Sequence, residues 1–70
     1  MKNYETIVSR LLKAEIKRKG FTYAELSQKL ATKGIIEKEA NIRNKLSRGT
    51  FSAAFLIQCL EAIGVDNLRL

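Results

Sequence analysis

The sequence predicts an all-α fold of four to five short helices in a single domain spanning residues 1–70. Three observations support this prediction. Apolar residues recur at helical spacing along most of the chain, the four glycines follow such segments, and there is no proline. Because glycine enters the left-handed conformation that ends many helices without steric cost, we interpret these glycines as helix ends. No segment alternates apolar and polar residues over the length of a strand.

The first helix is predicted at about residues 3–19. Its last turn contains Lys17, Arg18 and Lys19, which suit the negative end of the helix dipole, and Gly20 follows. One side of this helix is apolar and consists of Tyr4, Ile7, Val8, Leu11, Leu12 and Ala14.

A second helix is predicted from an N-cap at Thr22 to about Lys33. Thr22 and Glu25 have the spacing of a capping box, in which each side chain accepts a hydrogen bond from the other residue's backbone amide. Leu26 and Leu30 would be buried, and Gly34 would end the helix.

The third helix is predicted at about residues 37–48. Ile42 and Leu46 are four residues apart and are expected to face the core, which directs Asn41, Asn44, Lys45 and Arg48 largely to solvent. Two large apolar residues, Ile35 and Ile36, precede this helix, so the connecting turn is also expected to pack on the core.

The fourth helix is predicted to begin after the N-cap Ser52 and to end at Gly64. Its apolar face would consist of Ala53, Leu56, Ile57, Leu60 and Ile63. Phe51, Phe55 and Cys59 widen this face, either as additional core residues or as a dimer surface. A short final turn is possible at residues 66–70.

The formal net charge of +6 suits an anionic partner, such as nucleic acid, a membrane surface or an acidic protein. The alternative is that the lysines only solvate helix faces. The chain has no histidine and one cysteine. These counts remove the common zinc patterns and the usual hydrolytic arrangements, so we expect no metal, no cofactor and no enzymatic activity. No apolar run approaches the ~20 residues of a membrane span, and no segment resembles a signal peptide, so we expect a cytoplasmic protein.

Several short motifs between Leu11 and Val65 occur in an order typical of one known family. They are Gly20-Phe21-Thr22, Leu26-Ser27, Arg48-Gly49, Ser52 and Ile63-Gly64-Val65. This order resembles the helix-turn-helix domains of the Cro and phage-repressor (lambda repressor-like) family. The segment from Leu26 to Gly49 is about six residues longer than is usual there, so the resemblance implies a divergent member with a lengthened turn.

The resemblance implies a small DNA-binding transcriptional regulator that inserts its third helix, at about residues 37–48, into the major groove of double-stranded DNA. A homodimer, with Phe51, Phe55 and Cys59 as its candidate contact, would place two such helices in successive grooves. The candidate DNA-binding residues are Thr22, Tyr23, Lys38, Asn41, Arg43, Asn44, Lys45 and Arg48.

The candidate residues have different expected roles. The two asparagines would contact adenine edges, and Arg43, Lys45 or Arg48 would contact guanine or phosphate. Lys38, with Lys29 and Lys33, surrounds the turn and would contact phosphates. Tyr23 stands where the family has a glutamine that contacts a phosphate and braces the third helix.

Each role has a structural alternative. The asparagines could be ordinary solvated residues, Arg43 could pair with Glu39 four residues earlier, and Glu37 and Glu39 could serve only to complement the helix dipole. The alternative function is a helical protein-interaction module of the same fold that has lost DNA readout and holds its partner through Phe51, Phe55 and Cys59.

Overall fold

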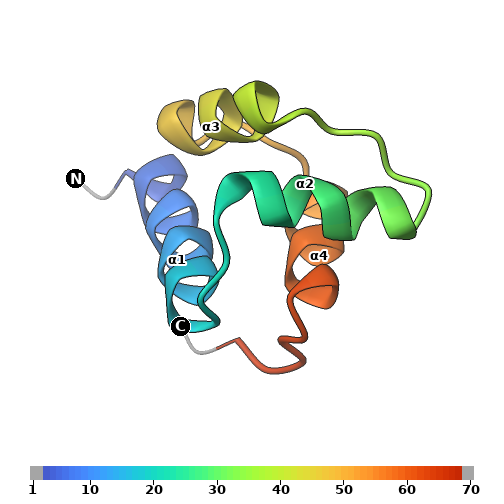
Figure 1. The fold of residues 1–70 in the computed structure, drawn as a ribbon. Helices are drawn as coiled ribbons and strands as arrows, with labels where there is room; N and C mark the ends of the chain where they lie inside the picture. The colour runs from blue at the N-terminus through green and yellow to red at the C-terminus, as the bar shows by residue number, and fades with distance from the viewer. Residues whose placement is uncertain (1–2, 69–70) are drawn as a thin grey trace.

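A computed structural model describes residues 3–68 of the chain. This range contains four α-helices and no strand, which confirms the predicted all-α class. The helices are α1 (Tyr4–Arg18), α2 (Tyr23–Thr32), α3 (Glu39–Arg48) and α4 (Ala53–Ala62). Both α3 and α4 pack against α1 and α2 (Figure 1). Residues 65–68 form no helix, and the rest of the possible turn at 66–70 lies outside the described residues.

All four helices contribute to one hydrophobic core. Its buried members are Leu12, Ile16, Leu26, Leu30, Ile42, Leu46, Phe55, Cys59, Leu60, Ile63 and Val65. Phe55 and Cys59 are 3% and 0% exposed, so of the two roles considered for them the core role is correct. Phe51 is half-buried and packs edge-on against Phe55, with 5.6 Å between ring centroids. The prediction that Phe51, Phe55 and Cys59 form a dimer surface is therefore wrong, because Phe55 and Cys59 are not accessible to a partner.

Local side-chain chemistry explains where three of the helices begin. The Asn3 side chain accepts a hydrogen bond from the Thr6 amide at the start of α1. Thr22 and Glu25 form the predicted capping box of α2, and Ser52 accepts a hydrogen bond from the Phe55 amide to cap α4. By contrast, α3 begins after Lys38 with no side-chain cap.

The four glycines all have positive φ and follow helix ends, as predicted. Gly49, the C-cap of α3, has a second constraint. A Cβ built on it would lie 2.6 Å from the Glu5 carbonyl oxygen in the first turn of α1. The end of α3 thus approaches α1 so closely that no side chain fits between them.

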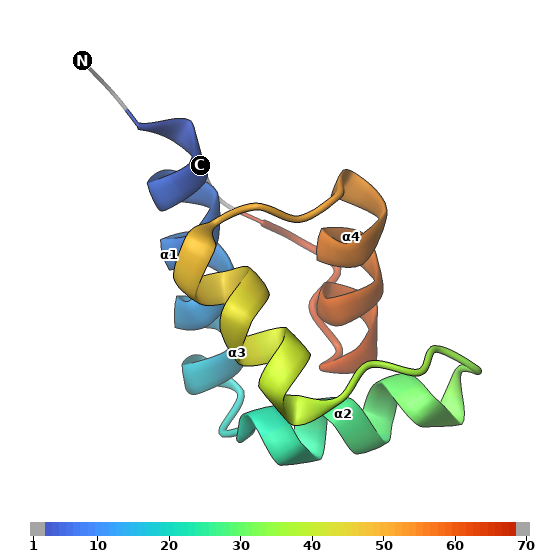
Figure 2. The ribbon, with the colours of Figure 1, turned by 90° about the horizontal axis from the view of Figure 1, so that it is seen from above.

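The connection between α2 and α3 folds back over α2 (Figure 2). The Ser27 hydroxyl donates a hydrogen bond to the Glu37 carbonyl at 2.5 Å, which fixes the connection to the middle of α2. Because the chain is held in this way, α3 begins at Glu39 rather than at Glu37, and Glu37 does not complement the dipole of the helix. Ile35 is half-buried as expected, but Ile36 is 80% exposed, so the prediction that both pack on the core is wrong for Ile36.

Candidate nucleic-acid interface

The C-terminal half of α3 is fastened to α1 by two contacts. One is the close approach of Gly49 to Glu5. The other is a buried hydrogen bond, in which the Ser9 hydroxyl donates to the Leu46 carbonyl. Carbonyls in the last turn of a helix lack a helical partner, so Ser9 satisfies one that would otherwise be unpaired. Together with the buried side chain of Ile42, these contacts fix which side of α3 faces outward.

The outward side of α3 carries three of the predicted DNA-binding residues. Asn41, Asn44 and Arg48 are exposed and are spaced three and four residues apart, so they lie along one side of the helix. The helix itself forms one edge of the molecule (Figure 1). The structure therefore brings these three side chains together on an accessible surface that can approach a large ligand.

Arg43 lies on a different flank of α3 and connects this helix to the start of α2. Its guanidinium is 2.6 Å from the Glu39 carboxylate, which confirms the ion pair predicted as its structural alternative. The same guanidinium lies 5.7 Å from the centre of the Tyr23 ring, a distance typical of a cation–π contact. Arg43 and Tyr23 thus join α2 and α3 while Arg43 stays exposed.

Lys45 does not face solvent as the helical spacing predicts. Its ammonium forms an ion pair with Glu37 and lies 4.5 Å from the centre of the Phe55 ring. Both partners lie outside the observed α3, and Glu37 belongs to the non-helical connection before it, so helical spacing carried no signal for this contact. Lys45 links the connecting loop, α3 and α4, and is not part of the outward side of α3.

The last two predicted residues occupy N-cap positions. The Thr22 hydroxyl accepts a hydrogen bond from the Glu25 amide, and the Thr22 amide donates to the Glu25 carboxylate at 2.9 Å. The hydrogen bond that the Glu25 carboxylate accepts from the Thr22 backbone amide is the main cause that lowers the pKa of Glu25. Lys38, the N-cap of α3, is exposed beside the start of the helix.

A basic hollow at the junction of α1 and α2 was not part of the predicted site. It has a volume of about 410 Å³ and is lined by Lys13, Ile16, Lys17, Gly20, Phe21, Thr22 and Tyr23. The four-residue spacing of Lys13 and Lys17, which places both on one side of a helix, was the available signal.

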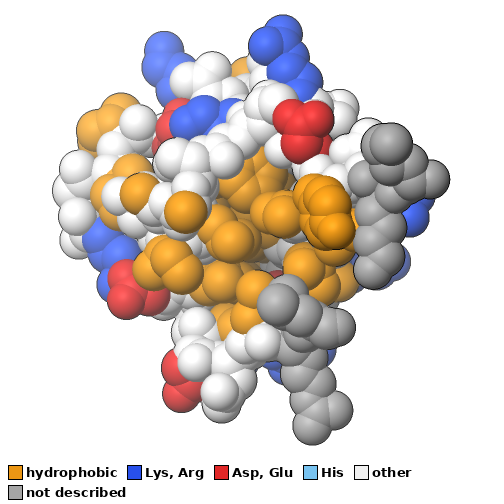
Figure 3. Space-filling model, turned by 180° about the vertical axis from the view of Figure 1, so that it is seen from behind, with side chains coloured by type: hydrophobic (Ala, Val, Ile, Leu, Met, Phe, Trp, Pro, Cys, Tyr) orange, Lys and Arg blue, Asp and Glu red, His pale blue; other side chains and the backbone are white. Residues whose placement is uncertain are grey.

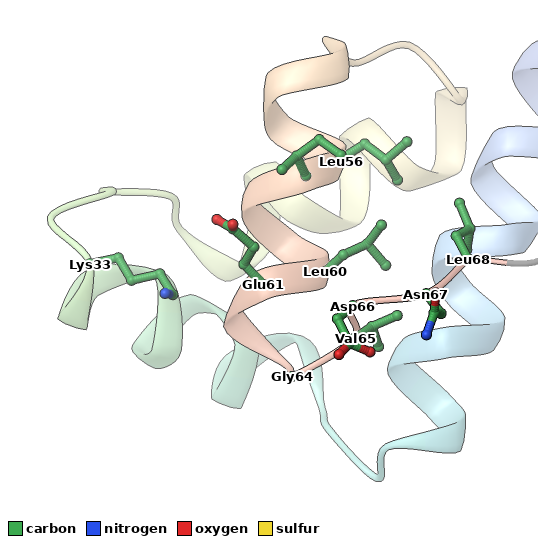
Figure 4. A pocket seen from close by; sticks show the side chains of 10 residues that line it. Lys33, Leu56, Leu60, Glu61, Gly64, Val65, Asp66, Asn67 and Leu68 are labelled. Atoms are coloured by element: carbon green, nitrogen blue, oxygen red, sulfur yellow. The ribbon is translucent and has the colours of Figure 1, made fainter.

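An apolar groove lies on the face of the molecule that is turned away from the viewer in Figure 1 and is seen in Figure 3. It has a volume of about 690 Å³ and runs between α4 and the segment that follows it. Leu56, Leu60, Val65 and Leu68 surround the groove, and Lys33, Glu61 and Asp66 lie around it (Figure 4). Ile57, which also lines it, is 53% exposed.

Within residues 3–68, no cluster of three or more cysteine and acidic side chains has the arrangement of a metal site. No helix in the same range is long and apolar enough to cross a membrane. No curated protein and no solved structure matches the sequence. Residues 4–68 match the family described as Domain of unknown function (DUF6471), and the chain belongs to this family.

Proposed function

We propose that this protein is a small DNA-binding transcriptional regulator that inserts α3 into the major groove of duplex DNA. The observation that carries the proposal is the exposed row of Asn41, Asn44 and Arg48 on a helix whose opposite side is buried. The net charge of +6 supports an anionic partner. In this proposal α2 and α3 form a variant lambda repressor-like helix-turn-helix, with a longer connection than the usual three to four residues.

The dimensions and chemistry of α3 suit this role. A helix of 10 residues is about 15 Å long, and an α-helix fits the major groove, which is about 12 Å wide. Asparagine side chains can pair bidentately with adenine, and Arg48 can contact guanine or phosphate. Lys38 and Arg43, which are exposed on either side of the row, would contact phosphates.

The decisive experiment measures binding of the purified protein to fluorescent random-sequence duplex DNA by anisotropy over a range of salt concentrations. We expect binding at low salt that weakens steeply as salt rises. Asn44→Asp places a carboxylate in the proposed groove-facing row and should weaken binding about tenfold, because the phosphates repel the added negative charge. Asn67→Asp is the matched control, because it makes the same chemical change at an exposed position beyond α4.

Two results would contradict this function. Micromolar protein that does not bind duplex DNA at low salt would exclude it. Equal effects of Asn44→Asp and Asn67→Asp would show that DNA does not contact the outward side of α3.

The apolar groove favours a second candidate function, a protein-interaction module, and its occupant would be a second copy of this chain. Lys33, Glu61 and Asp66 are exposed around the groove, and none of them forms an ion pair within residues 3–68. Because a two-fold interface places the same patch on both partners, a patch with both signs of charge is complementary to itself.

Sedimentation distinguishes this candidate from a monomer. Ile57→Asp should abolish self-association, because it introduces a charge into the groove at a position exposed enough to keep the fold intact. Ile36→Asp makes the same change at an isoleucine that is 80% exposed in the connecting loop, and it should leave association unchanged. A wild-type protein that sediments as a monomer at high micromolar concentration would exclude this second candidate.

A further inference from the structure

The cations of α1 form an unneutralised stripe. Arg10, Lys13 and Lys17 are exposed and are spaced three and four residues apart, so they share one side of the helix. We call these three residues the α1 stripe. Within residues 3–68 none of them has an ion-pair partner, whereas Arg18 on the same helix pairs with Glu15 at 2.6 Å. The stripe is therefore available to an external anion.

The stripe leads to the proposed reading helix through the hollow between α1 and α2. Lys13 and Lys17 line that hollow together with Tyr23, the first residue of α2. The Tyr23 ring in turn contacts Arg43 on α3. Figure 1 shows the start of α2 beside α1 and beneath α3. An extended anion that follows the hollow past Tyr23 to Arg43 can therefore contact the stripe and α3 together.

The length of the stripe suits a nucleic-acid strand. Seven residues of helix separate Arg10 from Lys17, which corresponds to about 10.5 Å. One DNA strand presents a phosphate about every 3.4 Å along the duplex axis, and neighbouring phosphates lie further apart along the winding strand itself, so the stripe spans about two to three phosphates. Its cations thus suit a row of regularly spaced charges, which an acidic protein surface would present less regularly.

We propose that the α1 stripe binds the phosphates of the DNA strand that flanks the base pairs contacted by α3. This inference rests on the proposed function, since it assigns α1 a part of the same interface. The stripe would supply affinity and its salt dependence, because phosphate contacts position a protein without carrying sequence information.

The test compares salt slopes of DNA binding. The variant Arg10→Gln/Lys13→Gln/Lys17→Gln should reduce the slope of log K against log salt by about 0.9 for each phosphate that is no longer neutralised, about 2.7 in all. Arg18→Gln is the reference for removal of a cation outside the stripe. Arg18 lies on the same helix, but its charge is already paired with Glu15 at 2.6 Å. It should leave the slope unchanged.

The outcomes separate the inference from the function on which it rests. A wild-type protein that does not bind duplex DNA overturns both. Wild-type binding with the same slope change per charge for the triple variant and for Arg18→Gln overturns the stripe alone. Circular dichroism shows whether each variant keeps its helical content, and single substitutions at Lys13 and Lys17 replace the triple variant where that content is lost.

Discussion

Replacing Gly49 with alanine is the most direct test of how α3 is fixed against α1. Gly49 has a φ of +71°, in the left-handed region, which costs a residue with a Cβ about 1–2 kcal/mol. The new Cβ would also lie 2.6 Å from the Glu5 carbonyl oxygen and 2.9 Å from its carbonyl carbon. These are backbone atoms that cannot rotate away, so overpacking adds about 1–3 kcal/mol. We expect Gly49→Ala to lower the free energy of unfolding by about 2–5 kcal/mol in total.

Gly34→Ala separates the two contributions. Gly34 has nearly the same φ, +79°, but a Cβ built on it meets nothing within 4 Å. Its substitution should therefore cost only the backbone strain of about 1–2 kcal/mol. The difference between the two variants, about 1–3 kcal/mol, measures the contact between α3 and α1.

Urea denaturation followed by circular dichroism gives both free energies on the same scale. Where Gly49→Ala is too unstable for a folded baseline, an osmolyte such as trimethylamine N-oxide, added equally to all three proteins, restores it. Equal losses for Gly49→Ala and Gly34→Ala would refute the reasoning, because they would show that the end of α3 does not touch the first turn of α1.

Three further predictions concern single side chains. Ser9→Ala should lower the free energy of unfolding by about 1–3 kcal/mol, measured by urea denaturation, because it leaves the buried Leu46 carbonyl without a donor. Glu39→Gln should strengthen DNA binding about two- to fivefold in the anisotropy assay, because it frees Arg43 from an exposed ion pair that is worth about 0.2–1 kcal/mol. Burial raises the pKa of the Cys59 thiol to about 12. An unfolded thiol titrates near 8.5 and releases its proton first, so stability should fall as pH rises above about 8.5, and Cys59→Ala should lack this contribution.

The parts of the fold that follow from local chemistry could be predicted from the sequence. The capping box of Thr22 and Glu25 and the cap at Ser52 each join residues only three positions apart, so the spacing along the chain contains the whole interaction. The glycine helix ends depend on backbone conformation at one residue. These features set the helix boundaries to within about two residues at most ends.

The predictions that failed depend on contacts between distant segments. Periodicity along α1 favours Ile7 as an inward residue, yet Ile7 is 36% exposed and Ser9 is 5% exposed. The reason is the Leu46 carbonyl, 37 residues away, which requires a buried donor at that point of α1. The expected start of α3 at Glu37 failed for a similar reason, because the bond from Ser27 holds the connecting chain against α2.

In the candidate site, too, positions that depend only on spacing within one helix were predicted correctly, and contacts with other segments were not. Spacing along α3 correctly places Asn41, Asn44 and Arg48 on an accessible side. It places Lys45 there as well, although the partners of Lys45 lie in the loop and in α4. No pattern within one helix can identify contacts such as those of Lys45 with Glu37 and Phe55.

The two glutamates near the start of α3 change how charge is divided across the proposed interface. Glu37 and Glu39 pair with Lys45 and Arg43, so the charges of these two cations of α3 are partly balanced within the chain. This leaves two asparagines and Arg48 on the outward side of α3, whereas all three residues of the α1 stripe are cations without an ion-pair partner within residues 3–68. If both proposals hold, substitutions at the α3 asparagines should change base preference at nearly constant salt slope, and substitutions in the α1 stripe should change the salt slope at constant base preference. An interface that mixed the two functions on one helix would not show this separation.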